Sequence, residues 1–252
     1  MTRGLGRVFS GFKRLVTLSV MWSMKHPMYS VPLRSPSVRS MAVLPLPFGK
    51  PKDLSLPNAT WGPEMMQLYE HYNSLCKVEV EAEGGQKKVP WKRIPGYNRL
   101  LKYATGGVYL SKMIQSKARL FTRNIREPGA AFEYALFINS EEEKCVGIWQ
   151  VGHLLEGPPG HVHGGAIATI IDTVTGCLAS LSGAVMTANL NINYRSPIQL
   201  GNTVVVESIV DKREGRKKFI SCKVTSPDGT KLHTEATALF LSIDINQLLL
   251  GR

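Results

Sequence analysis

At 252 residues, the chain is long enough for one substantial domain with extensions or for two small domains. It holds 31 Lys and Arg against 19 Asp and Glu, a formal net charge of +12. Nine of the basic residues fall in the first 52 positions, which contain no acidic residue, and the rest of the chain holds 22 basic and 19 acidic residues. Because the excess positive charge belongs to one end of the chain, it does not indicate a nucleic-acid-binding domain.

The N-terminal residues predict an amphipathic helix with one apolar and one basic face, at about 100° per residue. Its apolar positions are Leu5, Val8, Phe9, Phe12, Leu15 and Val16. An acid-free amphipathic N-terminus with Arg and Ser is typical of a mitochondrial transit peptide, which we assign to residues 1–40. We therefore expect the protein in the mitochondrial matrix or at the inner membrane, with the cytosol as a further location. The alternative is a membrane-surface helix that gives peripheral membrane association.

The remaining chain predicts a linker (residues 41–53), a helical N-terminal extension (54–117), a domain rich in strands (118–243) and a short tail (244–252). The extension contains a helix that begins near Pro63 and ends near Lys77. Strands are predicted at residues 120–126, 131–138, 144–151, 186–195, 203–211, 217–225 and 231–242.

One long apolar helix, at residues 164–181, lies among the predicted strands. Polar residues at Asp172, Thr173 and Thr175 interrupt it, so we do not expect it to span a membrane. A single apolar helix among antiparallel strands indicates an α+β fold in which a curved sheet wraps the helix.

The start of this helix carries the strongest chemical signal of the chain. Glycines at Gly164 and Gly165 leave the first helical N–H groups accessible to a ligand. The helix dipole aims these donors at a developing negative charge on oxygen. Asp172 lies two turns further in an apolar stretch, where a carboxylate is unfavourable unless it has a partner or a task. The pattern indicates an acyl-transfer site, and a structural carboxylate bonded to Thr173 or Thr175 is the alternative.

The strand at residues 186–195 alternates in polarity. The pattern puts Thr187 on the same face as Asn189, Asn191 and Asn193, and the apolar side chains on the other face. The cysteines and histidines lack the spacing of metal ligands, so we expect no metal and no cofactor.

His163-Gly164-Gly165, Asp172 nine residues further on, and the strand that ends in Asn193-Tyr194-Arg195-Ser196-Pro197 together resemble hotdog-fold thioesterases of the PaaI-like type. The resemblance implies a curved antiparallel sheet around one central helix. It also implies hydrolysis of medium- to long-chain fatty acyl-CoA thioesters to fatty acid and CoA. A homodimer with its active site at the subunit interface is implied as well.

Carried onto this chain, the resemblance implies that the Gly164 N–H polarises the thioester carbonyl. It also implies that His163 shapes the loop and is a candidate to bond the substrate. Asp172 of the neighbouring subunit would attack the carbonyl or activate water, and Thr187 would hold that water or orient the carboxylate. Further substrate contacts are expected from Gly165, Asn189, Asn193, Arg195, Lys217 and Lys218.

Two readings remain open at this point. The basic residues near Lys217 form either a solvated turn or, with Arg195, a site for the phosphates of CoA. The resemblance also leaves open a regulatory protein that binds a kinase such as protein kinase B.

The sequence departs from the family pattern at Gly157, which stands where several members of the family have an asparagine that assists carbonyl binding.

Overall fold

A computed structural model of the chain describes residues 53–81, 86–96, 121–123, 125 and 127–244. The predicted transit peptide, the linker through residue 52 and the tail from residue 245 lie outside the described residues. The helices and turns are α2 (Pro63–Leu75), η1 (Phe121–Arg123), η2 (His153–Leu155), α5 (Gly164–Ala179) and η3 (Ser180–Ser182). The strands are β1 (Val80–Glu81), β2 (Lys87–Lys88), β3 (Trp91–Ile94), β4 (Phe132–Asn139), β5 (Lys144–Val151), β6 (Val185–Tyr194), β7 (Thr203–Glu214), β8 (Lys217–Thr225) and β9 (Leu232–Ser242).

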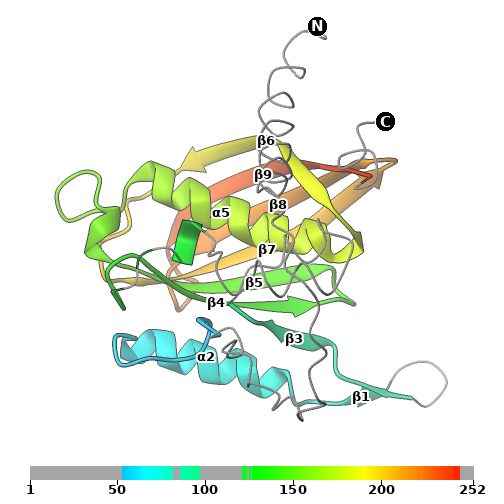
Figure 1. Cartoon of the computed structure of the whole chain (residues 1–252), viewed down its shortest axis with the longest axis horizontal. Helices are drawn as coiled ribbons and strands as arrows, with labels where there is room; N and C mark the ends of the chain where they lie inside the picture. The colour runs from blue at the N-terminus through cyan, green and yellow to red at the C-terminus, as the bar shows by residue number, and fades with distance from the viewer. Residues whose placement is uncertain (1–52, 82–85, 97–120, 124, 126, 245–252) are drawn as a thin grey trace, which may run out of the picture. The chain divides into compact units, whose positions relative to one another are not determined.

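An antiparallel sheet of seven strands, in the order β3-β4-β5-β7-β8-β9-β6, is the body of the fold. Strands β3 and β6 are therefore its two edges. The sheet curves around α5, which packs against β5, β6, β7, β8 and β9 (Figure 1). The predicted α+β hotdog fold, a curved antiparallel sheet around one long central helix, is confirmed.

Helix α5 buries one stripe of side chains against the sheet, with the three- and four-residue spacing of an amphipathic helix. The stripe consists of Ala166, Ile167, Ile170, Ile171, Val174, Thr175, Leu178 and Ala179. By length and composition alone, Gly164–Ser182 is long and apolar enough to cross a membrane, despite the polar residues within it. The core helix of a soluble protein meets the same criterion, and the buried stripe accounts for the apolar residues of α5.

Helix α2 covers the opposite face of the sheet at β4 and β5 (Figure 1). Along β4, Leu136 and Ile138 belong to the core around α5, whereas Ala135 and Phe137 pack with Met65 of α2. Every residue of β4 is buried for this reason, which explains its almost continuous apolar sequence.

Hydrogen bonds attach the entry of α2 to the sheet. The indole Nε1 of Trp61 donates to Glu133 Oε2 at 2.9 Å, and the N–H of Gly62 donates to Gln150 Oε1 at 2.8 Å. The N-terminal extension also supplies strand β3, which pairs with residues 136–139 of β4. The sheet thus begins before residue 118, where the sequence pattern first indicates strands.

The predicted strand at residues 120–126 is wrong, because Phe121–Arg123 form a 3₁₀ turn. The guanidinium of Arg123 lies 3.5 Å from the ring centroid of Tyr134. It donates to the carbonyl oxygens of Phe132 and Tyr134, at 3.2 and 2.5 Å. Strand β3 pairs with residues 136–139 of β4 and not with Phe132 or Tyr134. The Arg123 side chain therefore donates to the two carbonyl groups that a neighbouring strand would otherwise bond.

Candidate active site

His163 caps the first turn of α5. Its backbone is extended (φ −62°, ψ 135°), and its Nδ1 accepts a hydrogen bond from the N–H of Gly165 at 2.9 Å. Its carbonyl accepts from the N–H groups of Ala166 and Ile167 at 2.9 and 3.1 Å. Of the first four N–H groups of the helix, only that of Gly164 has no acceptor among the described residues. This N–H is a free donor at the positive end of the helix dipole.

The end of β6 is fastened to the same helical turn. Tyr194 donates from its hydroxyl to the carbonyl oxygen of Gly164 at 2.9 Å. The Tyr194 ring lies next to Gly164. A methyl group added at the Cα of Gly164 would be 3.6 Å from the nearest ring carbon, which is an ordinary van der Waals distance. Sequence reasoning included Tyr194 in the motif but assigned it no contact, since the strand pattern did not indicate that its hydroxyl reaches the helix.

Asp172 and Thr187, predicted as catalytic partners, lie together in the structure. The Thr187 hydroxyl donates to Asp172 Oδ1 at 2.8 Å and joins the middle of α5 to the start of β6. The hydroxyls of Thr173 and Thr175 instead donate to backbone carbonyls of the preceding helical turn, at 2.7 and 2.8 Å. The carboxylate is therefore bonded across to the sheet, and the alternative partners on its own helix are used elsewhere.

A β-bulge at Ala188 decides which side chains accompany Thr187. The register between β6 and β9 shifts between Thr187 and Asn189, so the side-chain alternation reverses there. Thr187 consequently faces α5 together with Leu190 and Ile192, which pack against the core. The predicted alternation, which put Thr187 on the asparagine face, is wrong. A two-residue polarity pattern contains no sign of an inserted residue.

A cavity of about 250 Å³ adjoins the Asp172–Thr187 pair. Its lining continues from Asp172 along α5 through Thr173, Gly176 and Cys177, and reaches Ser180 at the start of η3. The opposing walls are mainly apolar and include Ile94, Leu136, Phe121, Val185 and Phe240. The carboxylate thus stands at the edge of a space suited to an apolar chain.

A second cavity, of about 330 Å³, lies beside the first turns of α5 and is lined by His163, Gly165 and Thr169. Phe121 and Thr122 line both cavities, so turn η1 separates them. Gly165, predicted to contact substrate, lies in this second cavity and not beside Asp172 of the same chain.

The predicted substrate contacts on β6 lie away from the cavity next to Asp172. Beyond the bulge, Asn189 and Asn193 are exposed on the face opposite to α5. Arg195 follows the strand and donates from Nε and Nη2 to Glu235 Oε2 at 3.2 and 3.0 Å. Within one chain, Asn189, Asn193 and Arg195 therefore do not line the cavity next to Asp172.

Lys218 is excluded from the expected phosphate site because its ammonium is enclosed. Only 5% of the residue is exposed, and its Nζ donates to the carbonyl of Ala179 at 2.7 Å and to Ser182 Oγ at 2.6 Å. Burial lowers the pKa of Lys218, and the nearby charge of Arg213 lowers it further. Its neighbour Lys217 is exposed and remains available.

We expect Lys218→Met to lower the free energy of unfolding by about 1–3 kcal/mol, since the buried Ala179 carbonyl at the end of α5 loses its donor. Urea unfolding followed by circular dichroism measures this. The matched control is Lys217→Met on the same strand, which should change stability by less than about 0.5 kcal/mol. Equal losses in the two variants would contradict a specific role of Lys218 at the helix end.

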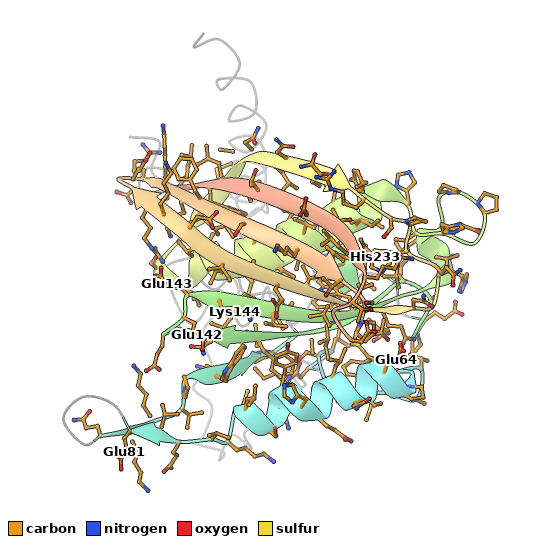
Figure 2. The ribbon with its side chains drawn as sticks, turned by 180° about the vertical axis from the view of Figure 1, so that it is seen from behind. Glu64, Glu81, Glu142, Glu143, Lys144 and His233 are labelled. Carbon is orange, nitrogen blue, oxygen red and sulfur yellow. The ribbon has the colours of Figure 1, made fainter. Side chains whose placement is uncertain are left out.

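The described residues contain no group of three or more His, Cys, Asp and Glu side chains that could hold a metal ion. The groups brought together around α5 are a carboxylate, a threonine hydroxyl and a helix N-terminus with one free N–H. Figure 2 labels charged side chains that lie outside this group: Glu81 on β1, Glu142 in the turn before β5, and Lys144 at the start of β5.

A curved antiparallel sheet around one central helix that carries a carboxylate is the arrangement expected of a hotdog thioesterase. Residues 159–233 match the family described as "Thioesterase superfamily". The chain is 45% identical over 194 residues to acyl-coenzyme A thioesterase THEM4 of Xenopus laevis, covering 77% of this chain and 82% of the relative. It is 33% identical over 198 residues to human acyl-coenzyme A thioesterase THEM5, covering 78% and 77%. The chain belongs to this thioesterase family.

A more distant relative is the uncharacterized mitochondrial membrane protein FMP10 of Saccharomyces cerevisiae. It is 27% identical over 129 residues, which cover 49% of this chain and 53% of the yeast protein.

Proposed function

We propose that the chain hydrolyses medium- to long-chain fatty acyl-CoA thioesters to fatty acid and CoA. The observation that carries the proposal is the Asp172 carboxylate, held by Thr187 at the edge of a mainly apolar cavity. The names of the THEM4 and THEM5 relatives, acyl-coenzyme A thioesterases, support the same substrate class.

In the proposed reaction, the thioester carbonyl oxygen accepts a hydrogen bond from the free Gly164 N–H. Asp172 takes a proton from a water molecule as the water oxygen attacks the carbonyl carbon. The tetrahedral oxyanion is stabilised by the same N–H and by the helix dipole. When the carbon–sulfur bond breaks, the CoA sulfur leaves and receives the proton from Asp172. Direct attack by the carboxylate, which forms a mixed anhydride, is the alternative. Label found in Asp172 after single turnover in ¹⁸O-water would establish this anhydride, because water must then have attacked the Asp172 carboxyl carbon.

The two reacting groups must come from two copies of the chain. Gly164 and Asp172 are eight residues apart on one helix, which separates them by roughly 12 Å along its axis. A single carbonyl group cannot contact both at that distance. We therefore infer that the Gly164 N–H of one subunit and the Asp172 carboxylate of the other form each site.

The edge strand β6 supports this arrangement. Thr187, bonded to Asp172, and Tyr194, bonded to Gly164, are about 23 Å apart along the strand. Antiparallel pairing of β6 with β6 of a second copy around their midpoint brings Tyr194 of one strand toward Thr187 of the other. Among the described strands, the outer edge of β6 has no partner, so its backbone groups can make this pairing.

The same pairing supports a phosphate site for CoA. Lys217 is in register with Leu241, which pairs with Met186 near the start of β6, whereas Arg195 follows the end of β6. In one chain the two cations lie at opposite ends of the strand. In the antiparallel dimer, Arg195 of the second copy approaches Lys217, where both could bind the phosphates.

We further propose that the protein works in mitochondria. The acid-free, amphipathic N-terminus supports this location, as does the name of the yeast relative. Imaging of a C-terminally tagged chain, with submitochondrial fractionation, separates the matrix, the inner membrane and the cytosol.

Thiol release from butanoyl-, octanoyl- and palmitoyl-CoA by the purified chain tests the proposed activity. Turnover that increases with chain length is expected, because the cavity next to Asp172 is mainly apolar. Absence of thiol release at every chain length would contradict hydrolysis and would favour the alternative of a kinase-binding protein on a thioesterase fold.

A further inference from the structure

Gly176 is a glycine in the interior of α5, four residues after Asp172. Residues four apart lie on the same helix face, so Gly176 is one turn, about 6 Å, beyond the carboxylate. It lines the cavity there, and Cys177 and Ser180 continue the lining further along the helix. An acyl chain that starts at a carbonyl beside Asp172 and enters this cavity passes Gly176 first.

Glycine is among the least favourable residues in a helix interior. Neither backbone conformation nor collision requires it here. Gly176 is not among the glycines with positive φ. A Cβ added to it would lie 3.5 and 3.6 Å from two ring carbons of Phe240, an ordinary van der Waals contact. Alanine would therefore fit the helix at least as well, and the remaining effect of the glycine is the open space that it leaves in the cavity.

We propose that Gly176 determines the acyl-chain length that the cavity accepts. The inference rests on the proposed thioesterase function and names the residue that sets its specificity. Phe240 lines the cavity beside Gly176 and is almost completely buried, so it cannot move aside easily for a larger side chain at position 176. Bulk added at Gly176 then occupies the path of the chain one turn below the reacting carbonyl.

The test measures kcat/KM of the purified full-length chain and of Gly176→Ala and Gly176→Leu with butanoyl-, octanoyl- and palmitoyl-CoA. We expect Gly176→Leu to lower the palmitoyl-to-butanoyl ratio at least about tenfold, and Gly176→Ala to lower it less. The thermal midpoint of Gly176→Ala should be no lower than that of the parent, since alanine favours the helix. This variant keeps the test valid even where leucine impairs folding.

Thr169→Leu is the matched control. Thr169 is on the same face of α5, seven residues before Gly176, but lines the second cavity. Whatever its effect on the overall rate, it should leave the palmitoyl-to-butanoyl ratio as in the parent. An unchanged ratio in both Gly176 variants, or an equal loss at all chain lengths, would overturn the role of Gly176 while leaving thioester hydrolysis established. An inactive parent would overturn the proposed function itself.

Discussion

Replacing Asp172 by asparagine is expected to lower kcat for palmitoyl-CoA by roughly 10²–10⁴-fold, the usual contribution of a general base. Asparagine has almost the same shape, and its Oδ1 can still accept the hydrogen bond of Thr187. The change therefore removes the negative charge and the proton acceptor while keeping the link between α5 and β6. Steady-state thiol release measures the loss, and circular dichroism checks the fold.

The chain contains a matched control for this variant. On the surface of β7, Asp211 accepts a hydrogen bond from the Ser221 hydroxyl at 2.8 Å, the same distance as in the Asp172–Thr187 pair. Asp211→Asn should leave thiol release unchanged, because this pair lies outside both cavities. If Asp172→Asn were as active as Asp211→Asn, the carboxylate would have no part in the reaction.

Replacing Gly164 by proline is expected to lower kcat by roughly 10²–10³-fold, the usual effect of losing one oxyanion donor. Proline lacks the N–H but is well tolerated at the first position of a helix, which Gly164 occupies. The extended backbone of His163 is also the conformation that a residue before proline prefers. The variant thus removes one donor and retains the helix start. Stopped-flow or steady-state thiol release provides the measurement.

Gly164→Ala is the companion variant, since it retains the N–H and adds a methyl group at an ordinary 3.6 Å contact with Tyr194. It should keep most of the activity. Equal losses in the alanine and proline variants would attribute the effect to crowding at Tyr194 and would contradict the role of the N–H.

Sequence reasoning could predict the central helix and most of the sheet, because the apolar periodicity of α5 and the alternation of the later strands arise directly from burial on one face. Strands β5 and β8 have the predicted bounds. Sequence reasoning could not predict the turn η1, because the apolar and β-prone residues around Phe121 suggested a strand. The side chain of Arg123 and its contacts with β4 determine that conformation, and such contacts between distant segments leave no local pattern.

In the site, too, local patterns predicted some features, and contacts between distant segments determined the others. The spacing from His163 to Asp172 follows from helix geometry and could be predicted, as could the pairing of Asp172 with Thr187 through the resemblance. The inserted residue Ala188 reverses the face of every later side chain in β6, so Asn189 and Asn193 point away from α5. The burial of Lys218 beneath the end of α5 depends on where η3 ends, which a run of basic residues in the sequence does not indicate.

The central claim is that each active site combines Asp172 of one subunit with Gly164 of the other. Asp172→Asn and Gly164→Pro chains, co-expressed with different tags and purified as mixed dimers, test it most directly. In a mixed dimer one site contains both changes and the other contains neither. Purified mixed dimers should therefore have roughly half of the parental activity, and an unfractionated random assortment, half of which is mixed dimers, roughly a quarter. A mixture as inactive as each variant alone, despite demonstrated mixed dimers, would contradict a site shared between subunits.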